Sequence, residues 1–251
     1  MLTFLHTQPE QSISLIKRLA RFSKFGLVVL AFLGASFSAQ AQLLDPFYAK
    51  YVAYRNGSEI GFAELELNKL ADSKFKLRFY SDASLFLIYD KREEISEFII
   101  QDNKLTPVKY AFTKKGTFKD SNLNASFDAS QSKVKMDNKP DLAWQGELDN
   151  QLYRLSAQKM LSQGKTEFDF DLINYRGEKK HYAFKVEGEE TLTLPFGELK
   201  ALKVKTIRQN SSRVTYSWFA PKLNYLMVRL QQFKDGNEQG DIQLSTFTQN
   251  K

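Results

Sequence analysis

The chain of 251 residues contains no cysteine. Disulfide bonds, thiolate catalysis and attachment of a lipid to a cysteine behind a leader are therefore excluded. Histidine is nearly as scarce, with two in the whole chain. The sequence also lacks glycine-rich phosphate-binding fingerprints and the Gly-x-Ser-x-Gly elbow of serine hydrolases. Most residue patterns that carry catalysis or bind nucleotides are missing, and no cofactor is predicted.

The first 41 residues have the pattern of a cleavable signal peptide. Basic residues between positions 17 and 24 precede an apolar stretch, Phe25 to Phe37, which is shorter than the ~20 residues that a transmembrane helix needs. Ala39-Gln40-Ala41 follows as a small-x-small cleavage site. We therefore predict export to the periplasm, with a mature chain that begins at Gln42 and is not a lipoprotein. The alternative is an N-terminal anchor that is retained.

The formal net charge of +7 overstates how basic the mature protein is. The first 41 residues hold four Lys and Arg against a single acid, Glu10, and so supply three of these charges. The others are spread along the chain, without the basic runs and interleaved aromatics that follow a phosphate backbone. Nucleic acid is therefore not an expected partner, whereas peripheral contact with an anionic membrane surface remains open.

Alternation of apolar and polar residues dominates residues 42–251. Phe75, Leu77 and Phe79 alternate with basic residues, and the segments 167–173, 181–186 and 214–218 repeat this period of two. Such segments are typical of antiparallel strands with one face in a core and the other in water. Turn signals separate them, of which Asn56-Gly57 is the strongest because a type I′ turn needs positive φ at both positions.

Two segments depart from the alternation. Asp149 to Gly164 carries apolar residues at helical spacing, with Asp149 as a candidate N-cap and Gly164 as the residue after the C-cap, and predicts one helix of about four turns. The polar stretch Ala129 to Lys139 predicts a long turn or a mobile edge.

These patterns predict an all-β fold with one helix, as a single β domain over residues 42–251. About ten to twelve antiparallel strands form a curved sheet, a barrel or half-barrel, with the helix capping or covering the opening. A barrel of this size encloses a cavity unless large side chains fill it. The chain has 21 Phe and 11 Tyr, enough for either outcome.

Candidates for catalysis or metal binding are weak, and no catalytic residue and no metal site is predicted. His181 lies on the polar face of its strand, where a solvated, non-catalytic role is expected. Glu167, Asp169 and Asp171 share one strand face, but the ~7 Å between them is long for a compact cation site. Pairing with basic stripes such as Lys203 and Lys205 explains them more simply.

The segment Tyr89 to Phe98 is rich in charge for a strand. One interpretation is an edge strand protected from aggregation by its charges. The other is that Arg92 points inward and binds the head group of a ligand in an otherwise apolar site.

Aromatic residues on the expected strands either form the core or line a ligand pocket. The stretch from Thr215 to Phe233 predicts two such strands joined by a turn at Ala220 to Asn224, without an acid or imidazole for proton transfer. The candidate pocket residues are Tyr51, Phe79, Arg92, Tyr110, Tyr182, Phe184, Tyr216 and Trp218.

Several stretches, in their order and spacing, carry a family resemblance. They are YVAYRNGSEIGFAELEL (51–67), KLTPVKYAF (104–112), SFD (126–128), LTLPFGELKALKVK (192–205) and WFAPKLNYLMVRL (218–230). Together they resemble the bacterial exported family catalogued as domain of unknown function 3108, over roughly Phe47 to Phe247. The resemblance implies an exported β fold and no mechanism. Met227 stands where the family tends to have proline. A similarity in architecture to lipoprotein-carrier half-barrels is an analogy of fold alone.

The first functional hypothesis is a non-enzymatic envelope protein whose half-barrel holds an apolar or amphipathic molecule such as a lipid. The second is a module with a packed core that binds another envelope protein. A hydrolase is the third, with no motif in its favour. A cavity lined by the aromatic residues distinguishes the first hypothesis from the second.

Overall fold

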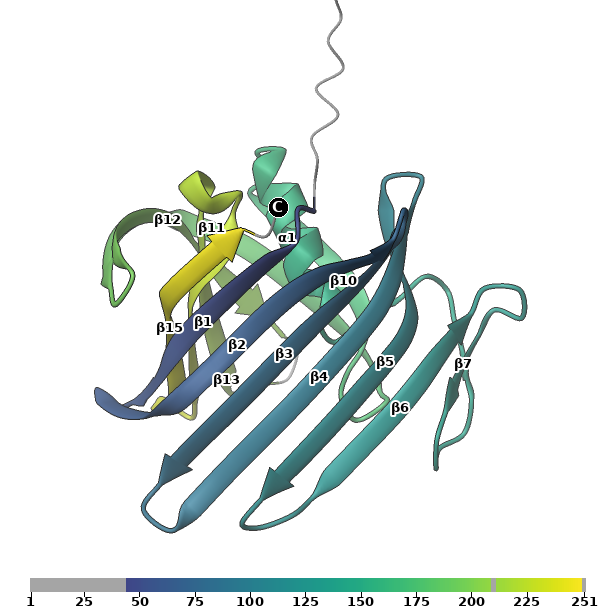
Figure 1. The fold of residues 1–251 in the computed structure, drawn as a ribbon, viewed down its shortest axis with the longest axis horizontal. Helices are drawn as coiled ribbons and strands as arrows, with labels where there is room; N and C mark the ends of the chain where they lie inside the picture. The colour runs from purple at the N-terminus through teal and green to yellow at the C-terminus, as the bar shows by residue number, and fades with distance from the viewer. Residues whose placement is uncertain (1–43, 209–210, 250–251) are drawn as a thin grey trace, which may run out of the picture. The chain divides into compact units, whose positions relative to one another are not determined.

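The computed structural model describes residues 44–208 and 211–249, which form one long sheet and one α-helix (Figure 1). The predicted signal peptide lies outside these residues. The elements in chain order are β1 (Phe47–Arg55), β2 (Ser58–Ala71), β3 (Lys74–Leu85), β4 (Ile88–Gln101), β5 (Lys104–Gly116), β6 (Ser121–Asp128), β7 (Lys133–Met136), β8 (Leu142–Ala143), β9 (Leu148–Asp149), α1 (Leu152–Ser162), β10 (Glu167–Ile173), β11 (Lys179–Leu194), β12 (Gly197–Ile207), β13 (Arg213–Ala220), the 3-10 turn η1 (Pro221–Leu223), β14 (Leu226–Lys234) and β15 (Asn237–Gln249).

The strand order is β8-β7-β6-β5-β4-β3-β2-β1-β15-β14-β13-β12-β11-β10-β9. Two meanders therefore meet where β1 pairs with β15, and we call them the first wing (β1–β8) and the second wing (β9–β15). All neighbours are antiparallel except β9 and β10, which are parallel. The predicted class, an antiparallel curved sheet with one helix, is confirmed.

The number of strands is higher than expected, at 15, partly because the short strands near the sheet edges carry too little pattern to be recognised. One of them, β7, lies inside the stretch Ala129–Lys139. The prediction of a long turn there was wrong, because Val134 and Met136 of β7 are buried against Tyr110 and Phe112. Two apolar residues, separated by one residue in an otherwise polar stretch, are only a weak indication of a strand.

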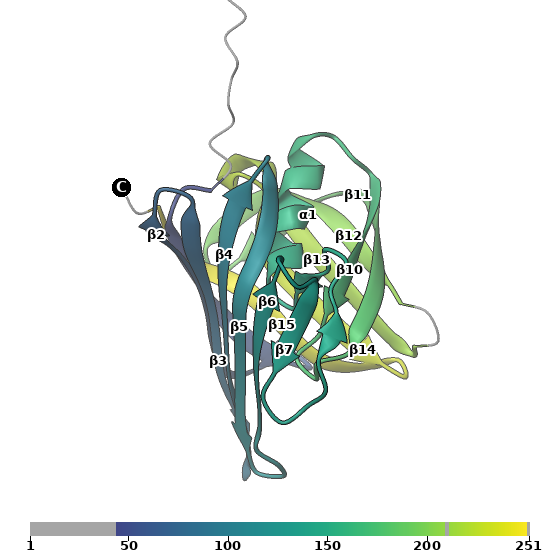
Figure 2. The ribbon, with the colours of Figure 1, turned by 90° about the vertical axis from the view of Figure 1, so that its right-hand side faces the viewer.

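The connectivity forces the sheet to curl. Strands β8 and β9 are its two opposite edges, yet only residues 144–147 separate them in the chain. Five peptide units span at most roughly 18 Å, so the edges cannot lie farther apart than that. Figure 2 shows the result, in which the two wings face each other.

Side chains hold the two wings together where no backbone ladder joins them. Tyr175, which follows β10, packs on Phe112 of β5 with ring centroids 5.1 Å apart. Lys139 donates from Nζ to the carbonyl of Arg176 at 2.6 Å. A Cβ on Gly177 would lie 2.7 Å from Met136 Sδ, so this turn lies directly against the first wing. The sheet is unclosed, but its seam is packed.

The helix α1 has 11 residues, one turn fewer than expected. Its C-terminal signal was correct: Gly164 has φ +74°, and Gly164 and Lys165 donate to the carbonyls of Leu161 and Met160, which is a Schellman motif. The N-cap is Gln151, not Asp149. Asp149 nevertheless accepts hydrogen bonds from the backbone N–H groups that begin the helix.

The helix lies between the two wings at one end of the curved sheet (Figure 2). Leu152 and Leu155 join a core cluster built mainly on β1–β4 and β11–β15, and Ala157 and Leu161 join another with Phe184 and Phe219. A third cluster, around Tyr110 and Phe127, lies near the seam. The helix therefore covers one opening of the half-barrel, as predicted.

Candidate functional site

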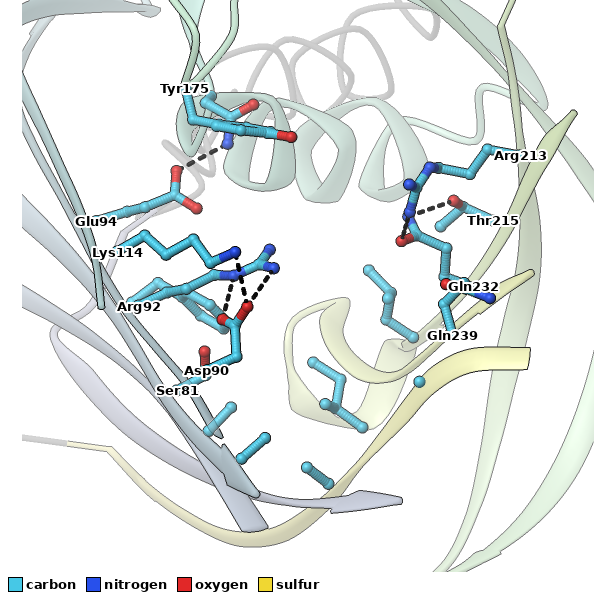
Figure 3. A pocket seen from close by; sticks show the side chains of 18 of the residues that line it. Ser81, Asp90, Arg92, Glu94, Lys114, Tyr175, Arg213, Thr215, Gln232 and Gln239 are labelled. Atoms are coloured by element: carbon cyan, nitrogen blue, oxygen red, sulfur yellow. Dashed lines mark hydrogen bonds and ion pairs between the residues drawn. The ribbon is translucent and has the colours of Figure 1, made fainter. Parts of the chain in front are cut away.

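The space between the wings contains a cavity of about 1160 Å³. Strands of both wings line it, together with Asn150, Tyr153 and Arg154 at the start of α1. Figure 3 shows Ser81, Arg92 and Lys114 on the wall formed by the first wing, facing Arg213, Thr215 and Gln232 on the second. The cavity is thus built from strands far apart in the sequence.

Nine lysine and arginine side chains line the cavity against four carboxylates. The carboxylates are those of Asp90, Glu94, Glu178 and Asp241. Apolar and aromatic side chains lie among these charges, including Ile60, Phe62, Phe79, Ile88, Phe118, Tyr153, Tyr175, Tyr182, Leu230 and Ile242. The cavity wall therefore combines an excess of positive charge with apolar and aromatic side chains.

On the first wing, Asp90 binds two cations. Arg92 donates to it from Nε at 2.6 Å and from a terminal nitrogen at 3.0 Å, and Lys114 lies 3.1 Å away (Figure 3). Burial alone would raise the pKa of the Asp90 carboxyl, but these hydrogen bonds and charges lower it below its ordinary value. Two cations share one carboxylate here, which leaves a net positive charge on this wall.

On the second wing, the cavity residues Arg208 and Arg213 have no carboxylate partner among the described residues, unlike Arg229, which pairs with Asp241 at 2.7 Å. Arg208 donates to Thr215 Oγ1 at 2.9 Å, and its guanidinium lies 4.6 Å from the centre of the Tyr182 ring. Arg213 donates to the amide oxygen of Gln232. The positive charges of these two arginines are therefore stabilised only by neutral hydrogen-bond acceptors and by the face of the Tyr182 ring. These contacts compensate a full charge less well than a carboxylate does.

Arg154 of α1 lines the same cavity and is only 9% exposed. Its guanidinium lies 4.7 Å from the centre of the Phe79 ring and donates to the side-chain oxygen of Gln151. Its Nε has no hydrogen-bond partner, and no carboxylate lies within ion-pair distance among the described residues. A buried cation without an ionic partner is costly unless an anion arrives from outside the chain.

A polar network lies beneath the N-terminus of α1. Glu94 accepts hydrogen bonds from Tyr110 at 2.5 Å and from Asn150 at 2.7 Å. Ser96 donates to Asp149, which is fully buried. Burial raises the pKa of the Asp149 carboxyl to about 6, against the lowering effect of its hydrogen bonds from Ser96, Gln151 and Leu152.

His181 also lines the cavity, with its side chain 48% exposed. Its Nδ1 lies 2.9 Å from Asp171 and its Nε2 4.0 Å from Asp169, while Glu167 pairs with Lys185 at 2.8 Å. In the described part of the chain, His, Asp and Glu nowhere gather in groups of three or more that could hold a metal ion. Among the described residues, the acidic stripe thus pairs with a lysine or arginine only through Glu167 and Lys185. The basic stripe named from the sequence was the wrong partner, because Lys203 pairs with Glu190 and Lys205 with Glu187.

Of the eight candidate pocket residues, Phe79, Arg92 and Tyr182 line the cavity. The interpretation of the Arg92 segment as an edge strand was wrong, because β4 lies between β3 and β5.

Tyr51, Tyr110 and Phe184 belong to the core instead, since each is at most 4% exposed. The hydroxyl of Tyr51 donates to the Met227 carbonyl at 2.8 Å, and the ring of Phe184 stacks on Phe168 and Tyr153. In this structure they lie in packed core clusters and not on the cavity wall.

Tyr216 and Trp218 point away from the cavity. Thr215 of the same strand lines it, and successive residues of a strand point to opposite faces. Trp218 donates to Glu190 at 2.8 Å, its ring contacts Lys203 and Arg229, and it is 3% exposed. It belongs to a core cluster with Ala201 and Ala220, so this face of β13 is buried too, and the period of two does not show which face turns to the cavity.

Four further cationic residues of the site were not predicted from the sequence. Lys114, Arg154, Arg208 and Arg213 stand on four different elements or their ends. Each looks like an ordinary solvated charge in its own segment, and only the curl of the sheet brings them together.

No described helix has both the length and the apolar composition to cross a membrane. A curled antiparallel sheet, unclosed and capped by one helix around an internal cavity, defines a β-barrel-like protein. The family model described as "Protein of unknown function (DUF3108)" matches residues 50–243, and the chain belongs to this family. The resemblance found in the sequence is thereby confirmed.

One solved structure supports the fold, and a second is less similar. A β-barrel-like protein of domain of unknown function DUF1849 from Brucella abortus has a TM-score of 0.61 at 10% identity, covering 83% of this chain and 99% of that one. A protein with a YmcC-like fold from Bacteroides fragilis reaches a TM-score of 0.33 at 9% identity, over 82% of this chain and 96% of that one. None of the curated proteins matches.

Proposed function

We propose that this protein is a non-enzymatic periplasmic binding protein that holds an amphipathic, anionic molecule of lipid type between its two wings. The observation that carries the proposal is the cavity of about 1160 Å³, which is lined by both aromatic and cationic side chains. The predicted signal peptide supports the compartment, and the absence of cysteine is consistent with it.

The size of the cavity favours a ligand over a packed interior. Ligand pockets usually measure about 300–1,000 Å³, and well-packed interiors hold few voids larger than a water molecule. A cavity of about 1160 Å³ is therefore too large to be a packing defect. The alternative function, an interaction module with a filled core, has no comparable observation in its favour.

The charges favour an anionic group on the ligand. Arg154, Arg208 and Arg213 line the cavity without an ionic partner among the described residues. A carboxylate, phosphate or sulfate of the ligand would accept their hydrogen bonds, and charge-assisted hydrogen bonds are the strong ones. The aromatic and aliphatic side chains between the arginines would contact the apolar part of the same molecule.

The test uses a fluorescent fatty acid and its methyl ester, together with native mass spectrometry of the protein purified from the periplasm. We expect a co-purifying lipid, and an acid that binds at least roughly tenfold more tightly than the ester. Arg208→Gln and Arg213→Gln should each weaken binding of the acid by roughly 10- to 100-fold. Lys200→Gln is the matched control, because Lys200 pairs with Glu189 at 3.6 Å and does not line the cavity.

Two results would reject the proposal. One is that neither acid nor ester binds to protein stripped of lipid. The other is that a protein partner co-purifies in fixed stoichiometry and no small molecule does, which would favour the interaction module.

A further inference from the structure

The turn between β3 and β4 exposes its two central residues almost completely. Phe86 is 97% exposed and Leu87 is 92% exposed. Phe118, between β5 and β6, is 81% exposed. Single exposed apolar residues are ordinary on a protein surface, but a group of large ones at one place usually marks an interaction site.

The local backbone does not require these residues. Phe86 has φ +55°, a region that glycine, asparagine or aspartate occupies more easily than an aromatic residue. Other tight turns of this sheet follow the rule, with Asn56-Gly57, Asp102-Asn103 and Asp235-Gly236 at their centres. A Phe-Leu pair at this turn adds strain and exposes apolar surface, and it contributes nothing to a core.

Hydrogen bonds hold the neighbouring turn beside it. Tyr89 donates from its backbone nitrogen to Thr117 Oγ1 at 2.9 Å, and Thr117 donates from its own backbone nitrogen to the Tyr89 carbonyl at 3.1 Å. Both turns project from the same, lower edge of the sheet in Figure 1. The side chains of Phe86, Leu87, Ile88 and Phe118 therefore form one surface, which we call the apolar tip.

Basic residues surround the apolar tip. Lys115 and Lys119 are exposed and form no ion pair among the described residues, whereas Lys91 and Lys114, on the strands behind the turns, pair with Asp82 and Asp90. Asp82, Asp90 and Asp120 are the acids of the same region. The surface is thus an apolar projection with a rim of net positive charge, which complements the anionic head groups of a membrane.

We propose that the apolar tip inserts into the interfacial region of a membrane that contains anionic phospholipid. A convex two-residue projection with a basic rim fits between lipid head groups, whereas a protein partner would need a matching pocket. Leu85, Ile88, Tyr89 and Phe118 also line the cavity, and the last three are exposed, which places an opening of the cavity beside the apolar tip. Insertion would therefore bring the cavity opening to the bilayer surface, although the proposal does not depend on a ligand in the cavity.

The test is co-sedimentation with vesicles of phosphatidylcholine, with and without phosphatidylglycerol. The main variant is Phe86→Asn/Leu87→Gly, which places the Asn-Gly pair of turn 56–57 here and should leave the hairpin folded. We expect the wild-type protein to bind vesicles with phosphatidylglycerol, and this variant to lose at least roughly tenfold in partitioning. Lys115→Gln/Lys119→Gln should weaken binding and its dependence on salt.

The matched control is Leu70→Ser, since Leu70 is 47% exposed near the β2–β3 turn, at the opposite end of β3. This variant should bind vesicles like the wild type. The proposal is overturned if the wild type does not bind the anionic vesicles, or if the Asn-Gly variant binds them equally well. It is also overturned if the wild type forms a dimer that the variant does not and neither binds vesicles, because the tip would then contact a second copy.

Binding of the fluorescent fatty acid in solution separates this proposal from the function proposed above. The Asn-Gly variant should retain it, because the arginines of the cavity are unchanged. If the wild type binds vesicles but does not bind the fatty acid, the proposed ligand of the cavity is rejected and the proposed membrane contact is supported.

Discussion

The buried carboxyl of Asp149 should make the stability of this protein fall between about pH 4 and pH 6. Asp149 is fully buried, accepts hydrogen bonds from Ser96 and from the backbone N–H groups of Gln151 and Leu152, and has a pKa raised to about 6 by burial. Asp149→Asn is the informative change. The amide keeps an oxygen for the two backbone donors and turns its NH₂ toward Ser96, whose hydroxyl also accepts, while the titration disappears.

The direction follows from proton binding. The carboxyl binds its proton more tightly in the folded protein, with a pKa of about 6, than in the unfolded chain, where the ordinary value is 3.8. Its contribution to folding is therefore fully present below pH 3.8 and is lost as the pH rises through 6. At 1.36 kcal/mol per pKa unit, the loss amounts to roughly 3 kcal/mol. That is a large part of the 5–15 kcal/mol by which domains are typically stable.

The assay is urea unfolding, followed by the fluorescence of Trp144 and Trp218, for wild type and Asp149→Asn at several pH values from 4 to 7.5. Circular dichroism checks that both probes report one transition. Other groups titrate in both proteins, so the quantity of interest is the difference in unfolding free energy. The wild type should lose roughly 3 kcal/mol relative to the variant as the pH rises. Differences that stay constant within about 0.5 kcal/mol, the usual size of a neutral surface effect, would refute a raised pKa at Asp149.

Two further predictions concern the β1–β2 region and are measured by the same urea unfolding at pH 7. Gly61→Ala should destabilise by about 2–4 kcal/mol, because Gly61 has φ +148° and a Cβ there would lie 2.0 Å from the Asp82 carbonyl oxygen. Gly240→Ala is its control, with nothing nearer than 3.9 Å, and equal effects would contradict the steric argument. Tyr51→Phe should cost about 1–2 kcal/mol, because the Met227 carbonyl loses a buried donor at 2.8 Å. Tyr48→Phe, which removes a half-buried bond to Glu64, should cost less, and the reverse order would contradict this prediction.

Local patterns in the sequence predicted the elements well because each depends on near neighbours. Asn56 and Gly57 have φ +50° and +78°, as the type I′ turn requires, and Gly164 ends α1 in the left-handed conformation. The predicted start of α1 was less accurate. Asp149, the predicted N-cap, lies two residues before the actual N-cap but still accepts hydrogen bonds from the first N–H groups of the helix. The side chain of Asp149 therefore acts as a helix cap although the residue belongs to strand β9.

The face that a strand turns inward could not be read from one chain. In β13 the apolar residues Tyr216 and Trp218 lie away from the cavity, whereas Thr215 lines it. Alternation distinguishes two faces and marks the more apolar one as buried, and Trp218 does lie in a core cluster. It cannot show which face turns to the cavity, because β13 is buried on both faces, with Phe219 in a second cluster. For a similar reason the cationic residues of the site could not be predicted, because they come close together only when the sheet curls.

The aromatic content of the chain is high enough to fill a half-barrel, and the cavity exists because of where these side chains lie. Phe75, Phe98 and Leu152 pack in a core cluster shared with the helix, and another cluster closes the seam. Between them, the inward positions of β3, β5, β13 and β14 carry small or polar residues, among them Ser81, Ala83, Lys114, Thr215 and Gln232. Such side chains neither span the gap between the wings nor tolerate a dry interior. The space between the two wings therefore stays open, and its charged walls need polar contacts there, which water supplies.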